Sequence, residues 1–123
     1  MNLVEIQEIL DAEWAWKEHC PDCWSREVYS CRASDLMNDV LSFQGAGSLL
    51  LTGLTNAQVI RTAGVADIAA ICFVRGKRPD METVRLAEEQ GLPLLVTHLM
   101  MFEACGRLYA KGLRGEAGER GDH

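Results

Sequence analysis

The sequence predicts an α/β fold: a three-layer α/β/α sandwich with a mostly parallel sheet and an N-terminal β ribbon. From residue 46 onward, short apolar runs alternate with helix-like segments in the order strand, helix, strand, helix, strand, helix. At these lengths, that order gives right-handed βαβ crossovers and therefore parallel strands. The apolar runs are continuous rather than alternating, which is typical of strands covered by helices on both faces.

The segments of this half have clear boundaries. Three apolar runs predict strands, at residues 47–53, 67–74 and 92–97. Each is followed by a predicted helix, at residues 55–64, 80–91 and 98–112. The first two helices begin with a capping residue or an acidic first turn and end at Gly64 and Gly91, as helices commonly do.

The N-terminal part predicts two helices around a ribbon. Leu3, Ile6 and Leu10 share one helical face in the first segment. Residues 12–19 and 25–31 have β-rich patterns and are expected to pair, with HCPDCW as the connection between them. A Ser-Asp cap then opens a second helix over residues 34–43.

Length and composition indicate one domain over residues 1–113, followed by a disordered tail over 114–123 that has almost nothing to bury. The chain has 123 residues, of which 48% are hydrophobic and 24% charged, as in ordinary soluble proteins. No apolar run approaches the roughly 18–20 residues that cross a bilayer. The N-terminus carries acids where a signal peptide carries Lys or Arg, so we expect a cytoplasmic protein without a membrane partner.

The net charge of −6 argues against a nucleic-acid partner, because binding to the phosphate backbone needs clustered basic residues. The one basic cluster is short and fits a small anion better than a duplex. It consists of Arg75, Lys77 and Arg78.

Small, hydroxyl and basic residues follow the three predicted parallel strands, where open α/β sheets bind ligands. They form the candidate ligand-binding set: Thr52, Gly53, Thr55, Asn56, Arg75, Lys77, Arg78, Thr97 and His98. Gly53 permits close backbone approach, and the following helix offers free N–H groups to a phosphate or carboxylate. The competing interpretation is structural, since the same residues serve as ordinary caps, a turn and a solvated loop. The segment TGLTNAQ lacks the Gly-Lys-Ser/Thr of a P-loop.

Catalytic groups are not evident. An enzyme acting on a phosphorylated substrate through Arg75, Thr97 and His98 would lack a nucleophile–base pair, and no Gly-x-Ser-x-Gly motif occurs. We therefore expect a non-enzymatic protein without a cofactor.

The HCPDCW stretch leaves three interpretations open. Cys20, Cys23 and Cys31, with His19 as a fourth group, are candidate metal ligands, because the Cys-x-x-Cys spacing lets two thiolates reach one ion. A second such pair is absent, and a redox motif would open a helix rather than precede a β-rich run. The third interpretation is a turn, for which Pro21 and Asp22 have suitable chemistry.

The other cysteines and the tryptophans have simpler expectations. Cys72 and Cys105 lie in apolar segments and are expected to be buried as small hydrophobes. Trp14, Trp16 and Trp24 form either a contact surface or part of the core.

Three segments resemble the DRTGG-domain family: SDLMNDVLSF, LLLTGLTNAQVIRTAGVADIAAICFVRGKRPD and FEACGRLYAKGL. The resemblance covers roughly residues 1–113, with these segments in matching order and spacing. The Asp-Arg-Thr-Gly-Gly string that gives the family its name is absent here.

The resemblance implies a stand-alone domain similar to the N-terminal domain of HPr kinase/phosphorylase, an α/β/α unit without the catalytic machinery of the kinase. Such domains accompany CBS or phosphotransacetylase modules, and some stand-alone versions are encoded beside iron-only hydrogenases. The resemblance thereby implies a role in regulation or assembly. With the missing catalytic groups and the strand-end cluster, the leading hypothesis is a regulatory or interaction domain, homodimeric, that senses a small anionic metabolite or nucleotide or binds a protein partner. No family catalytic residues exist to carry over. The alternative hypothesis is a metal- or redox-active protein that uses Cys20, Cys23 and Cys31.

Overall fold

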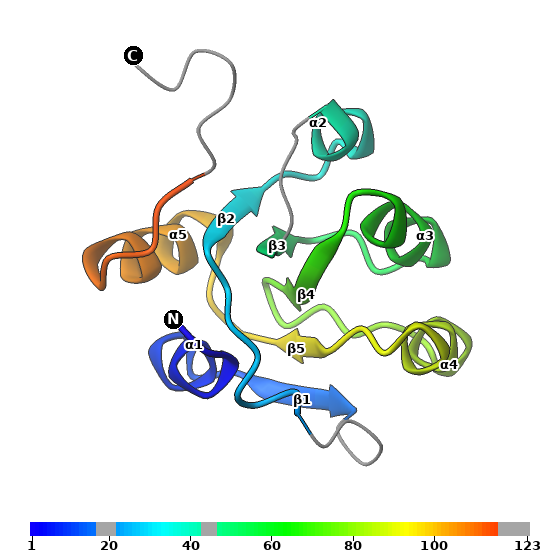
Figure 1. Cartoon of the computed structure of the whole chain (residues 1–123), viewed down its shortest axis with the longest axis horizontal. Helices are drawn as coiled ribbons and strands as arrows, with labels where there is room; N and C mark the ends of the chain where they lie inside the picture. Colours follow the sequence, from blue (N-terminus) through cyan, green and yellow to red (C-terminus); the bar gives the residue numbers. More distant parts are fainter. Residues whose placement is uncertain (17–21, 43–46, 116–123) are drawn as a thin grey trace.

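The structure is a computed structural model that describes residues 1–16, 22–42 and 47–115 (Figure 1). Along the chain the elements are α1 (Leu3–Leu10), β1 (Glu13–Trp16), β2 (Ser30–Ala33), α2 (Met37–Ser42), β3 (Ser48–Thr52), α3 (Ala57–Val65), β4 (Ile68–Phe73), α4 (Met81–Gln90), β5 (Leu94–Val96) and α5 (Met101–Ala110). No helix in these ranges is long and apolar enough to span a bilayer.

The five strands form one sheet in the order β1-β5-β4-β3-β2. Strands β2, β3, β4 and β5 are parallel, and β1 joins β5 in the antiparallel direction. Figure 1 shows α1 and α5 on one side of the sheet and α2, α3 and α4 on the other. The predicted α/β class, with a mostly parallel sheet between two helical layers, is therefore confirmed.

Each face of the sheet has its own apolar core, which explains why the strands are apolar throughout. In β3, Leu50 faces the core under α2, α3 and α4, whereas Leu49 and Leu51 face the core under α1 and α5. In β4 the alternation continues, with Phe73 in the first core and Cys72 in the second. Fully burying one such large side chain contributes about 1.5–3 kcal/mol, so both layers are firmly held to the sheet.

The predicted N-terminal ribbon is wrong, because β1 and β2 lie at opposite edges of the sheet. The indole Nε1 of Trp16 donates a buried hydrogen bond of 2.9 Å to the Leu92 carbonyl, which fixes β1 beside β5. Residues 24–28, before β2, run along the N-terminus instead: the Val28 N–H donates to the Met1 carbonyl at 2.7 Å. That path carries the chain across to β3, where β2 pairs in parallel.

Side-chain caps set the helix starts. Asn2 and Glu5 form a capping box at α1, and Asn56 and Asp80 accept hydrogen bonds from the first turns of α3 and α4. Helix α4 ends at Gly91, as expected, with a φ of 67°. Helix α3 continues past the predicted end, so that Gly64 lies inside its last turn.

The C-terminal segment differs from the expected tail at its first two residues. The Cys31 N–H donates to the Arg114 carbonyl at 2.9 Å, and Cys31 forms a parallel bridge with Gly115. The rest of the predicted tail, residues 116–123, lies outside the described residues.

Candidate functional site

The carboxyl ends of the parallel strands meet at one edge of the sheet, as the sequence predicted. Thr52 pairs with Phe73, and Phe73 pairs with Val96, so β3, β4 and β5 end at the same level. The Val74 N–H then donates to the Thr52 carbonyl at 3.0 Å, and the Thr97 N–H donates to the Phe73 carbonyl at 2.9 Å. The loops after the three strands therefore start side by side.

Arg75 and Gly53 are in direct contact at this edge. A β-carbon on Gly53 would stand 3.0 Å from Cζ and 3.2 Å from Nε of Arg75, and still nearer to Nη2. The glycine therefore makes room for the guanidinium. The backbone of Arg75 has a φ of 61°, in the left-handed region, and its N–H donates to the Leu99 carbonyl at 2.8 Å. Within the described chain, the guanidinium has no hydrogen bond or ion pair.

The two threonines of the candidate set are buried, and their hydroxyls have protein partners. Thr97 Oγ1 donates to the Leu10 carbonyl at 2.6 Å and accepts from the Leu99 N–H at 3.2 Å. Thr52 Oγ1 donates to Asp35 Oδ1 at 2.9 Å and accepts from the Leu54 N–H at 3.2 Å. These hydroxyls hold the loops in place rather than facing solvent.

Three further candidates divide between structural and exposed positions. Asn56 caps α3 by accepting from the Val59 N–H at 3.3 Å, while Thr55 is half-buried in front of it. Arg78 forms an exposed ion pair with Glu13 of β1, which engages its guanidinium away from the strand ends.

Three exposed cationic or titratable side chains are left at the strand ends: Arg75, Lys77 and His98. His98 lies over Gly76, whose β-carbon would stand 3.1 Å from Nδ1. Gly76 has a φ of 68°, and its N–H donates to the Thr97 carbonyl at 2.8 Å, which ties the loop after β4 to the loop after β5. Among the described residues, no acceptor pairs with these three side chains.

Asp35 is a site residue that the sequence did not indicate. Its Oδ1 accepts hydrogen bonds from Thr52 Oγ1 at 2.9 Å and from the Gly53 N–H at 2.8 Å, so its carboxylate joins the ends of β2 and β3. The Ser-Asp pair resembles a helix cap, but α2 begins only at Met37, and Ser34 instead accepts from the Leu36 N–H at 2.9 Å in the turn before the helix. Recognising residues 30–33 as a parallel strand would have placed Asp35 at the strand-end edge.

The candidate metal ligands are only partly described. Cys23 is buried in the core under α2, α3 and α4 and takes part in a disulfide. Cys31 packs against the core on the opposite face of the sheet, so the structure does not bring these two residues together. His19 and Cys20 lie outside the described residues. No group of three metal-ligating side chains occurs in the part of the chain that the structure describes.

The remaining thiols share the core under α1 and α5. Cys72 is fully buried, as predicted, whereas Cys31 and Cys105 are half-buried. Burial, with a smaller contribution from Cys105, raises the pKa of the Cys31 thiol to about 12. Burial also raises the pKa of Cys72 and of Cys105 above the ordinary thiol value. Elevated pKa values keep these thiols protonated and poorly nucleophilic.

The tryptophans are mostly core residues. Trp16 is buried, and Trp14 and Trp24 meet edge to face, with their ring centroids 6.0 Å apart. Only Trp24 is exposed, so the three do not form one contact surface.

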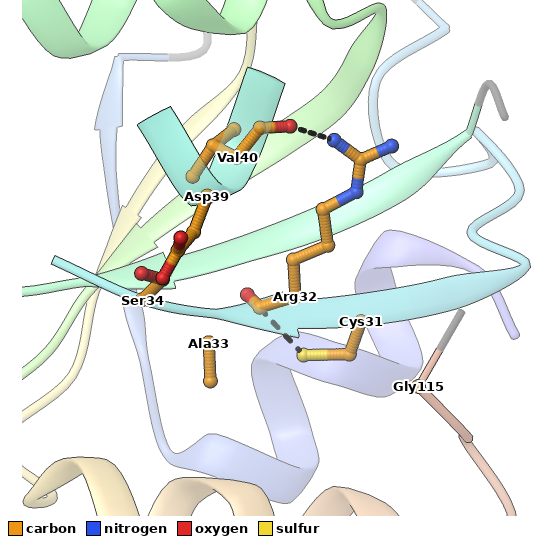
Figure 2. A pocket seen from close by; sticks show the side chains of 7 residues that line it. All are labelled: Cys31, Arg32, Ala33, Ser34, Asp39, Val40 and Gly115. Atoms are coloured by element: carbon orange, nitrogen blue, oxygen red, sulfur yellow. Dashed lines mark hydrogen bonds between the residues drawn. The ribbon is translucent and has the colours of Figure 1, made fainter. Parts of the chain in front are cut away.

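A cavity of about 350 Å³ lies elsewhere, beside edge strand β2 (Figure 2). Its lining consists of Cys31, Arg32, Ala33, Ser34, Asp39, Val40 and Gly115. Arg32 is buried and donates to the Val40 carbonyl at 2.6 Å, which satisfies the end of α2. None of the strand-end candidates lines this cavity.

Comparison with known proteins shows a similarity of fold. No protein-family model and no curated protein matches the sequence. The chain is similar to a crystal structure of the CBS and DRTGG domains of the regulatory region of Clostridium perfringens pyrophosphatase, complexed with its activator diadenosine tetraphosphate. The match has a TM-score of 0.65 at 14% sequence identity and covers 87% of this chain. Because it covers only 45% of the other chain, this protein corresponds to less than half of that regulatory region. The similarity supports a DRTGG-like fold.

Proposed function

We propose that the protein is a non-catalytic regulatory domain that binds a small anionic metabolite or nucleotide at the strand-end edge. The observation that carries the proposal is the gathering of Arg75, Lys77 and His98, exposed and without acceptors in the described chain. Guanidinium and ammonium groups in such a position suit phosphate, which Arg can bind through two parallel hydrogen bonds.

The similar pyrophosphatase region supports this proposal, because it is regulatory and was crystallised with a nucleotide activator. The nature of the strand-end residues supports the non-catalytic part. Thr52 ends β3 and Thr97 directly follows β5, and both hydroxyls are buried and hydrogen-bonded to protein groups. The Thr52 hydroxyl donates to the Asp35 carboxylate, but its burial keeps it from reaching a substrate as a nucleophile would have to.

Direct binding measurements test the proposal. Isothermal titration calorimetry with phosphate, AMP and ADP should show saturable binding, and Arg75→Gln should weaken the binding of all three ligands. Because the site is an exposed edge rather than a deep cleft, we expect dissociation constants on the order of 0.1–1 mM. Absence of binding by every anion at 10-fold higher concentrations would leave only a scaffolding role.

The remaining expectations stay predictions. Sedimentation equilibrium tests the homodimer, and cell fractionation tests the cytoplasmic location. A link to iron-only hydrogenase systems rests on the sequence resemblance alone. The metal or redox alternative also stays a prediction, and elemental analysis of anaerobically purified protein tests it.

A further inference from the structure

Asp35 places a negative charge beside the proposed anion site, which a site for a simple anion would not need. Its Oδ1 accepts from the Gly53 N–H, and the Arg75 guanidinium lies where a β-carbon on the same glycine would be. Both side chains are exposed, and no ion pair joins them. An acceptor and a donor therefore flank Gly53 without satisfying each other.

The hydrogen-bonding capacity of the two groups defines what could lie between them. An ionised carboxylate only accepts, and a guanidinium only donates. Asp35 Oδ1 already accepts two hydrogen bonds, whereas Oδ2 receives none from the described residues. The complementary ligand must present hydrogen-bond donors to Oδ2 and an anionic group to Arg75.

We infer that this pair selects a phosphate ester with neighbouring hydroxyl groups, such as a nucleoside or sugar phosphate, over inorganic phosphate, with Asp35 as the specificity-determining residue. The inference deepens the proposed function and rests on it. A ribose diol donates readily to a carboxylate at the carboxyl edge of a parallel sheet, where acidic residues serve this purpose in other α/β proteins. Three basic or titratable side chains favour a doubly charged phosphate over the single carboxylate of an amino acid.

The Asp35 carboxylate should also lower the affinity for anions that lack hydroxyl groups. Inorganic phosphate carries only a small number of donors and would place its charge near that of Asp35, which weakens its binding. A hydroxylated ester can turn its diol toward Asp35 and its phosphate toward Arg75. The two opposite charges then contribute to affinity together.

Asp35→Asn separates this role from the structural one. The amide keeps an Oδ1 that accepts from Thr52 Oγ1 and from the Gly53 N–H, so the joint between β2 and β3 is preserved. Only the negative charge is lost, and an unchanged melting temperature would verify that the fold is intact. The neutral amide oxygen makes weaker hydrogen bonds to hydroxyls than the carboxylate does.

The experiment is calorimetric titration of the wild-type protein and of Asp35→Asn with AMP, 2′,3′-dideoxy-AMP, ribose 5-phosphate and inorganic phosphate. We expect the wild type to bind AMP about 10-fold more tightly than dideoxy-AMP, since one well-placed charged hydrogen bond corresponds to roughly that factor. In Asp35→Asn this preference should largely disappear, while inorganic phosphate binds as well as before or better.

The outcomes are distinguishable. Equal binding of AMP, dideoxy-AMP and phosphate by the wild type overturns the role of Asp35 but leaves the anion site standing. Absence of binding by all four compounds overturns the proposed function itself. If ribose 5-phosphate binds as well as AMP, the ligand is recognised as a sugar phosphate; if AMP alone binds, with its hydroxyl preference, a nucleoside is required. Should Asp35→Asn not fold, equal binding of AMP and dideoxy-AMP by the wild type would still overturn the inference.

Discussion

The Arg75 guanidinium occupies the position that a β-carbon on Gly53 would take. The contact connects the loops that follow two neighbouring strands, β3 and β4, and it holds a charged group at the edge where we propose ligand binding. A substitution of Gly53 can therefore displace the Arg75 guanidinium while the arginine itself is unchanged.

Gly53→Ala should displace the guanidinium and weaken anion binding several-fold, measured by calorimetry with AMP. The group in the way is the far end of a flexible side chain, and Gly53 has no positive φ. The free energy of unfolding should therefore change by less than about 1 kcal/mol.

Gly106→Ala is the matched control. It lies at an exposed position of α5, with nothing within 4 Å of its added β-carbon. It should stabilise the helix by about 0.5–1 kcal/mol and leave binding unchanged. Equal loss of binding in both variants would contradict the role of the Gly53–Arg75 contact.

Arg75→Gly should make the protein more stable while it weakens anion binding. Holding a non-glycine residue at a φ of 61° costs about 1–2 kcal/mol, of which the greater freedom of glycine in the unfolded chain cancels part. We expect a net gain of about 0.5–1 kcal/mol in urea unfolding. Asp67 has a φ of 60° on the other end of the sheet, and aspartate tolerates this region better. Asp67→Gly should therefore gain less stability than Arg75→Gly and bind AMP as the wild type does. A destabilised Arg75→Gly would show that its side chain supports the fold.

Thr97→Val should destabilise the protein by about 1–3 kcal/mol, because it leaves the buried Leu10 carbonyl and the Leu99 N–H without their hydroxyl partner. Valine has nearly the same shape, so the loss reports on the hydrogen bonds rather than on packing. Chemical denaturation measures the loss. A change below about 0.5 kcal/mol would mean that water replaces the hydroxyl.

The thiol groups predict a loss of stability at alkaline pH. The folded-state pKa of Cys31 is about 12, against an ordinary value of 9.0, so the unfolded chain releases this proton first. The free energy of unfolding should keep its full value below pH 9 and fall as the pH rises from 9 toward 12. Cys31→Ala should show a shallower decline than the wild type over this interval, because it lacks this thiol. At pH 8 the native Cys31 should also resist alkylation, and rapid labelling there would refute its burial.

The strand-end cluster could be predicted from sequence because it depends on topology alone. Once three apolar runs are recognised as parallel strands, the residues after them must share an edge, which brought Arg75 and His98 together correctly. Two details depended on elements that local patterns could not place. Arg78 turns to Glu13 because β1 lies beside β5, and Asp35 reaches Gly53 because β2 lies beside β3.

The partner of a short strand is decided by contacts distant in sequence. Nothing in the EWAW pattern indicates that the Trp16 indole donates a hydrogen bond to the Leu92 carbonyl, 76 residues away in the sequence. The ribbon was the natural inference from two adjacent β-rich segments, and it failed for this reason. In the same way, the Ser-Asp pair resembles a helix cap in sequence, and only the tertiary structure shows that Asp35 joins the ends of β2 and β3.

Both edges of the sheet carry features that hinder pairing with the edge strand of another copy of this protein. Unpaired N–H and C=O groups along an edge strand are templates for aggregation. At β2, Arg114 and Gly115 close the edge at Cys31, and at β1 the register shifts between Trp14 and Trp16, with the charged Glu13 at its start. A bulge and a charge on one side and a covering segment on the other are the devices by which β-sheets resist edge-to-edge polymerisation. Residues 114 and 115 thus protect the β2 edge at Cys31 from pairing with another chain.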